Sequence, residues 1–185
     1  MNVTYKEPII FIVSGKARSG KSTVTEYIEQ YYKNKKCINL MYAEAIKNYA
    51  KKIVGWDGSE ETKPRTFLQQ LGTEIIRNKI DENFFIKRMI DDIKIYSHFY
   101  DIITISDARF INELEEPKKY YKNVIVINII NPNLSSLTNE QLKHSSENAL
   151  NDYQNYDYII INDSTLENLK EKVFEILDGI KVDNH

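Results

Sequence analysis

Five short apolar runs, separated by segments with helical periodicity, constrain the fold of this 185-residue chain more than any other feature. The runs cover residues 8–14, 36–43, 101–106, 123–130 and 157–162. Runs that are apolar at nearly every position are typical of strands buried on both faces of a parallel sheet. Because strands that alternate with helices form βαβ units, we predict an α/β fold with a five-stranded parallel sheet and helices on both faces.

Length and composition indicate one soluble domain over residues 1–185. The net charge of -2 gives no field that would attract nucleic acid or acidic lipid, so we expect neither as a partner. No apolar run approaches the roughly 20 residues that span a membrane. The N-terminus has no basic segment leading a signal-type apolar stretch, and we therefore expect a cytoplasmic location. The single cysteine, Cys37, forms no internal disulfide and is expected to be a small core residue.

The stretch GKARSGKST follows the first apolar run directly and fits the pattern G-x-x-x-x-G-K-[ST]. Glycines let the backbone curl so that its N–H groups point at phosphate oxygens, and the following helix adds its positive end. We therefore predict an ATP site with bound Mg²⁺. In this pattern Lys21 reaches the β and γ phosphates and Ser22 binds Mg²⁺. The predicted nucleotide-binding residues are Gly15, Lys16, Ala17, Arg18, Ser19, Gly20, Lys21, Ser22 and Thr23.

A carboxylate follows the third apolar run at Asp107. At that position it lies beside the phosphate loop, where it can hold Mg²⁺ through water or orient an acceptor. The alternative is that Asp107 caps the next helix. Phosphoryl transfer also needs fixed positive charge, and the chain has only five arginines. We assign catalytic roles to Lys21, Asp107, Arg109 and Arg18, because both arginines lie near the predicted phosphate site.

A polar stripe follows the helix predicted to begin near Pro64. Arg65, Gln69, Thr73 and Arg77 recur every four residues, opposite an apolar face. We predict that these four residues bind the acceptor, with a solvent-exposed helix face as the alternative. Gly72 lies in the same helix, where glycine costs roughly 1 kcal/mol relative to alanine, and an acceptor nucleotide lying against the helix would explain it.

Seven segments occur in an order that resembles the phage-type deoxynucleoside monophosphate kinases, a part of the P-loop nucleoside monophosphate kinase group. They are GKARSGKST, YAEAIKNYA, GWDG, RTFLQQLGTEIIR, ISDARFINELE, HSSE and YIIINDSTLENL. The resemblance runs from about residue 8 to residue 177. It implies a P-loop kinase fold and transfer of the γ-phosphoryl group of ATP to a deoxynucleoside monophosphate. It also implies Mg²⁺ and, in many members, a homodimer.

Two inserts and two alternative functions complete the sequence-based interpretation. We expect a helical acceptor-binding insert at about 56–98 and a short lid-like insert at about 131–150. One alternative is a P-loop kinase for another phosphorylated acceptor such as phosphomevalonate. Phosphomevalonate kinases of the P-loop type share a similar glycine loop and an SD-x-R segment. The other is a nucleotide-dependent switch that hydrolyses ATP slowly and binds a protein partner.

Overall fold

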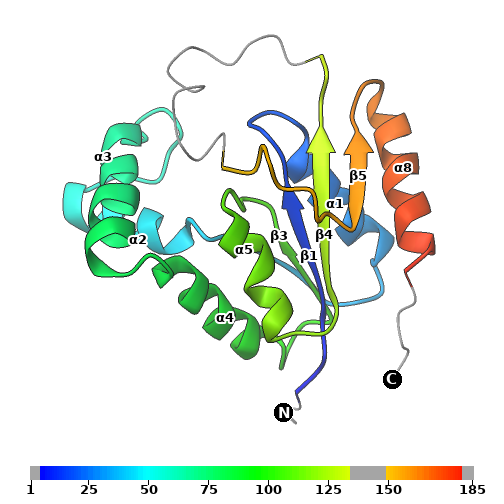
Figure 1. Ribbon diagram of the computed structural model, residues 1–185, viewed down its shortest axis with the longest axis horizontal. Coiled ribbons are helices and arrows are strands. Elements are labelled where there is room, and N and C mark those ends of the chain that lie inside the picture. The colour runs from blue at the N-terminus through cyan, green and yellow to red at the C-terminus, as the bar shows by residue number, and fades with distance from the viewer. Residues whose placement is uncertain (1–4, 134–148, 181–185) are drawn as a thin grey trace.

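The computed structural model describes residues 5–133 and 149–180, and these build an α/β fold around a five-stranded parallel sheet (Figure 1). The strands are β1 (Ile9–Ser14), β2 (Cys37–Leu40), β3 (Ile102–Ile105), β4 (Val124–Ile130) and β5 (Tyr158–Ile161). Their order across the sheet is β2-β3-β1-β4-β5, and every neighbouring pair is parallel. Each strand lies within one of the five apolar runs, so the predicted sheet is confirmed.

Strand β1 lies in the middle of the sheet, and all six of its residues are buried. Ile10 and Ile12 join the core on one face, whereas Ile9, Phe11 and Val13 join the core on the other. Because successive side chains of β1 enter cores on opposite faces, each of residues 9–13 must be apolar.

Helices cover both faces. Behind the sheet in Figure 1 lies α1 (Lys21–Tyr31), which packs against α8 (Leu166–Asp178) at the right, and both helices join the core that contains Phe11 and Val13. In front of the sheet in Figure 1 lie α4 (Phe84–Tyr96) and α5 (Ile111–Glu115), and the short 3₁₀ turn η2 (Pro117–Lys119) follows α5. Helix α2 (Glu44–Val54), at the left in the figure, contributes Ile46 to the same core. No helix in the described ranges is long and apolar enough to cross a membrane.

One helix changes type along its length. It begins as α3 (Arg65–Gln69) and continues as a π-helix, η1 (Gln70–Ile80). The N–H of Asp81 still donates to the carbonyl oxygen of Ile76 at 2.9 Å, five residues back. Most π-helices are single-turn bulges and are frequent at functional sites, so eleven residues of this geometry mark η1 as unusual.

Helix α4 contributes to the core below α5. Its residues Phe85, Ile86, Met89 and Ile93 are buried against the front of the sheet. The predicted insert boundaries at 56–98 and 131–150 stay predictions, and residues 134–148 of the second insert lie outside the described ranges.

Candidate active site

The glycine loop connects β1 to α1 and has a backbone that few residues tolerate. Gly15 and Gly20 have φ angles of 141° and 107°, and Arg18 has a φ of 63°. A Cβ on Gly15 would lie 2.5 Å from the carbonyl oxygen of Ile129, and one on Gly20 would lie 2.7 Å from Nδ2 of Asn162. Both glycines are therefore required by backbone angle and by space.

The lysine of the loop folds back over it. Nζ of Lys21 donates hydrogen bonds of 2.8 Å to the carbonyl oxygens of Gly15 and Lys16. Lys21 is also the first residue of α1, so the N–H groups at the helix start lie beside the loop. Ser22 follows it and is exposed. The ammonium group and the helix start therefore lie where the sequence predicted an anion site.

A residue that sequence analysis missed supports the loop from the end of β5. Nδ2 of Asn162 donates a 2.9 Å hydrogen bond to the carbonyl oxygen of Ser19. The Ser19 hydroxyl oxygen is buried, without a hydrogen-bond partner in the described structure, and Ser19 lines the cavity beside the loop. Asn162 shares one signal with Asp107: each is a polar residue within two positions of the carboxyl end of a strand, β5 and β3 respectively.

Asp107 lies in the loop after β3 and connects it by hydrogen bonds to the loop between β2 and α2. Its two carboxylate oxygens accept hydrogen bonds from the backbone N–H groups of Tyr42 and Ala43, at 2.9 Å and 3.0 Å. Burial raises the pKa of this carboxyl, and the two N–H groups oppose the shift. The alternative that Asp107 caps the next helix is wrong, since α5 begins at Ile111 with Phe110 at the capping position.

Arg109 and the glycine loop line the same cavity, which has a volume of about 590 Å³. Gly15, Lys16 and Ser19 contribute the loop side, and Arg109 contributes the β3 side. The remaining wall is formed by residues from the end of β4, from the segment before β5 and from β5 itself: Asn128, Ile129, Ile130, Asn131, Leu150, Asn151, Tyr153, Gln154, Tyr156 and Ile159, with Ala108 beside Arg109. Residues far apart in the sequence thus meet at the carboxyl edge of the sheet, where ligands of such sheets bind.

The four residues of the predicted acceptor stripe separate into two pairs. Arg65 and Gln69 are exposed on α3, and Arg65 forms an ion pair with Glu60. Thr73 and Arg77, on η1, instead line a second cavity of about 990 Å³. The structure therefore brings together only two of the four residues.

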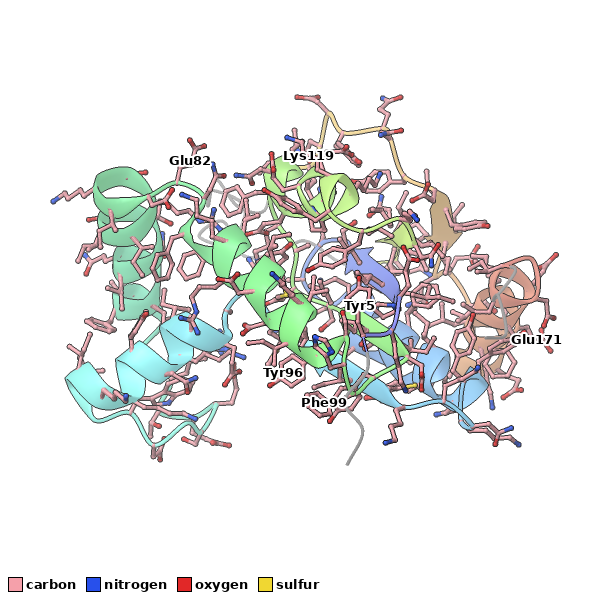
Figure 2. The ribbon with its side chains drawn as sticks, turned by 90° about the horizontal axis from the view of Figure 1, so that it is seen from below. Tyr5, Glu82, Tyr96, Phe99, Lys119 and Glu171 are labelled. Carbon is pink, nitrogen blue, oxygen red and sulfur yellow. The ribbon has the colours of Figure 1, made fainter. Side chains whose placement is uncertain are left out.

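The second cavity lies between η1 and α5. Its other lining residues are Asn78, Glu82, Phe110, Ile111, Asn112, Glu115, Glu116 and Ala149. Figure 2 shows Glu82 on the link between η1 and α4. The two cavities are neighbours. Arg109 and Leu150 line the cavity beside the glycine loop, and the adjacent residues Phe110 and Ala149 line the second cavity.

Arg77 forms a buried ion pair with Glu113. Its side chain is 12% exposed, and Nη2 lies 2.5 Å from Oε1 of Glu113, whose side chain is 2% exposed. The guanidinium carbon also lies 4.2 Å from the ring centre of Phe110 and 5.1 Å from that of Phe85. Burial raises the pKa of the Glu113 carboxyl, and the Arg77 guanidinium lowers it.

Gly72 has a different role from the predicted one. A Cβ at this position would lie 2.8 Å from Cδ1 of Ile46 on α2. The close approach that the glycine permits is therefore made by a neighbouring helix, and the predicted contact between Gly72 and an acceptor nucleotide is wrong.

The described residues contain no cluster of three or more histidine, cysteine, aspartate or glutamate side chains that could hold a metal ion by themselves. A metal at this site would instead take oxygens from phosphate, water and a few side chains, as Mg²⁺ does in nucleotide sites. Ser22 and Asp107 stay the predicted contacts.

Several solved structures with the same architecture are kinases. A sugar kinase from Janibacter sp. HTCC2649 has a TM-score of 0.57 at 13% identity, covering 92% of this chain and 95% of its own. The APS kinase CysC of Mycobacterium tuberculosis, in complex with AMPPNP and APS, gives 0.55 at 11%, covering 94% and 99%. Shikimate kinase from Bacteroides thetaiotaomicron gives 0.54 at 14%, covering 92% and 98%. No curated protein matches the sequence significantly.

The fold and the phosphate loop define this chain as a P-loop kinase, an enzyme that transfers a phosphoryl group from ATP. A family model for deoxynucleotide monophosphate kinase matches residues 50–173. The chain therefore belongs to the deoxynucleotide monophosphate kinase family.

Proposed function

We propose that this enzyme transfers the γ-phosphoryl group of ATP to a deoxynucleoside monophosphate and yields the diphosphate. The observation that carries the proposal is the cavity in which Arg109 faces the glycine loop. Phosphoryl transfer needs two phosphate groups side by side within fixed positive charge, and this cavity has cationic residues on both sides. The family match supports a nucleotide as the acceptor.

The donor nucleotide binds at residues 15–23. Lys21 exchanges its hydrogen bonds to the loop carbonyls for bonds to the β and γ phosphates, which is a small movement for a flexible side chain. Ser22 would hold Mg²⁺ together with phosphate oxygens, and the ion would neutralise charge on the phosphates. Asp107 would contact the ion through water, since each of its carboxylate oxygens accepts only one backbone hydrogen bond, from Tyr42 or Ala43, and keeps a lone pair.

The acceptor occupies the second cavity with its base and sugar. Glu82, Glu115 and Glu116 line this cavity, whereas Arg77, which also lines it, is already paired with Glu113. The balance of charge therefore disfavours a phosphate there. The acceptor phosphate therefore points away from the glutamates and towards Arg109, on the segment shared by the two cavities. Arg65 and Gln69 stay predicted acceptor contacts on α3.

In the transfer step an oxygen of the acceptor phosphate forms a bond to the γ-phosphorus, and the bond from that phosphorus to the β–γ bridging oxygen breaks. ADP leaves with the electron pair. The attacking phosphate is largely ionised at neutral pH, so no side-chain base is required. Lys21, Arg18 and Arg109 supply the charge that stabilises the transferring group.

The test is ADP release from ATP and Mg²⁺ with a panel of deoxy- and ribonucleoside monophosphates, with phosphomevalonate included. We expect strong stimulation by one or a few deoxynucleotides. Stimulation by phosphomevalonate alone would indicate the alternative kinase. Stimulation by none of them, with ATP binding intact in calorimetry, would contradict the proposal and favour the nucleotide-dependent switch.

Three further expectations belong to the same proposal: absence of nucleic-acid binding, a homodimer and a cytoplasmic location. Light scattering of the purified protein measures the oligomeric state, and a monomer at micromolar concentration would contradict the dimer.

A further inference from the structure

Among the described residues, Glu113 is the most deeply buried carboxylate that the proposed mechanism does not use, and it has several charged and polar partners. Oε1 pairs with Nη2 of Arg77 at 2.5 Å. Oε2 accepts the backbone N–H groups of Arg109 at 2.7 Å and Phe110 at 3.2 Å. Its own carbonyl oxygen accepts the hydroxyl of Tyr42 at 2.7 Å.

These contacts hold the main chain where Arg109 leaves it. The loop after β3 is tied at one end by Asp107, which accepts N–H groups from the β2–α2 connection. It is tied at the other end by Glu113, which accepts the N–H of Arg109 itself. A side chain whose backbone is fixed on both sides loses much of its freedom to turn away from the cavity.

Arg77 extends the same network to the acceptor side. It reaches Glu113 from η1 and lies over the ring of Phe110, so η1 and the Arg109 loop share one ion pair. Breaking a buried pair by removing one partner is costly because it leaves an uncompensated charge. The network therefore keeps the acceptor helix and the Arg109 loop in a fixed relation.

We infer that Glu113 is a positioning residue, which aims Arg109 at the glycine loop by holding the backbone of Arg109 and Phe110 and by anchoring Arg77 of η1. This rests on the proposed function, in which Arg109 contacts the reacting phosphates. Glu113 touches neither nucleotide, and its effect on turnover passes through Arg109.

The test is a double-mutant cycle of Glu113→Gln with Arg109→Ala, measured as kcat and KM in the ADP-release assay. Glutamine keeps the shape of the Glu113 side chain but removes its negative charge. Its amide nitrogen is a donor, so it cannot accept a hydrogen bond from Arg77 or from the backbone N–H groups. We expect Glu113→Gln to lower kcat by at least tenfold, with KM for ATP changed less than threefold. In the Arg109→Ala background the same change should lower kcat less than threefold, because the group that it positions is gone. An equal loss in both backgrounds would overturn the inference.

Amide hydrogen exchange gives a readout that needs no acceptor. In wild type the N–H groups of Arg109 and Phe110 should be protected, and Glu113→Gln should lower that protection at least tenfold. A wild-type enzyme that phosphorylates no monophosphate would contradict the proposed function alone, whereas unchanged protection in the variant would contradict the positioning role.

Two further variants complete the comparison. Arg77→Gln leaves the carboxylate free to accept both N–H groups, and it should lower kcat less than Glu113→Gln does; the reverse order would contradict the inference. Glu171→Gln is the matched control, since Glu171 is exposed on α8, far from Glu82 in Figure 2, and should leave kcat and exchange unchanged.

Discussion

At the scale of single residues, the chemistry of the site depends on a few groups whose surroundings are unlike those of a surface side chain. Lys21 is held over the glycine loop by two backbone carbonyls. Glu113 is buried against a guanidinium, and the Ser19 hydroxyl is buried beside the loop. The Lys21 ammonium and the Ser19 hydroxyl are hydrogen-bond donors beside the loop, and donors in that place are typical of a site for an anionic ligand. Glu113 is an anion itself, and its partner is the Arg77 guanidinium.

Replacing Lys21 by alanine is expected to abolish turnover without unfolding the protein. The ammonium stabilises charge on the transferring group, and loss of one such contact costs about 10²–10³ in kcat. The side chain contributes no core packing, so the circular dichroism spectrum and thermal midpoint should stay near those of wild type. Lys16→Ala, an exposed lysine of the same loop, measures the effect of losing charge nearby. A folded Lys21→Ala enzyme with wild-type kcat would contradict the assignment.

The thiol of Cys37 is expected to be unreactive in the native protein. Burial raises its pKa to about 11, against about 8.5 in an unfolded chain. The fold therefore favours the protonated thiol, and this contribution to the free energy of unfolding is present below about pH 8.5 and is lost as the pH rises towards 11.

At pH 8 the thiolate fraction of native Cys37 should be about 10²-fold lower than in denaturant. The rate of reaction with a disulfide reagent measures it, and Cys37→Ser gives the blank. Equal rates in native and denatured protein would contradict the pKa shift.

At the scale of elements, the change from α3 to η1 decides which residues face the site. A repeat of four residues marks a common face only if the helix keeps α geometry throughout. Here the wider π turns begin at Gln70, and Arg65 and Gln69 stay exposed whereas Thr73 and Arg77 line a cavity. The stripe that looked uniform in the sequence therefore divides at the point where the helix changes type.

The contact of α2 with η1 at Gly72 predicts the effect of a larger residue there. Gly72→Val should destabilise the protein by about 1–3 kcal/mol, because Ile46 already occupies the space of a Cβ. Urea unfolding measures it. Glu74→Val, at an exposed position of η1, controls for the effect of a β-branched residue on the helix.

Combining Gly72→Val with Ile46→Ala should cost less than the sum of the two single changes, since the new methyl groups fill the space that the isoleucine leaves. Strict additivity would show that the two helices are not in direct contact at Gly72.

At the scale of the whole molecule, five parallel strands bring their carboxyl ends to one edge of the sheet. The glycine loop, the Arg109 loop and Asn162 come from three different strand ends and meet there. The site is therefore a property of the assembled sheet, and binding of ATP at this edge must stabilise the fold as a unit.

ATP with Mg²⁺ at 100 times its dissociation constant should stabilise the protein by about 2.7 kcal/mol, which corresponds to a rise in thermal midpoint of roughly 5–10 °C for a chain of this length. Differential scanning fluorimetry measures the rise. Lys21→Ala should show a clearly smaller shift at the same concentration. A shift of the same size in both proteins would place the nucleotide away from the glycine loop.

The sequence by itself determined the five strands, the parallel sheet and the phosphate loop of this kinase. Those features depend on local rules: an unbroken apolar run for a strand buried on both faces, and glycines where the backbone needs positive φ angles. Only the tertiary structure decided that Arg77 pairs with Glu113, that Asp107 holds the β2–α2 connection and that Gly72 faces Ile46. Each of these contacts joins residues more than twenty positions apart, and no local pattern specifies which distant group a buried charge or a glycine will meet.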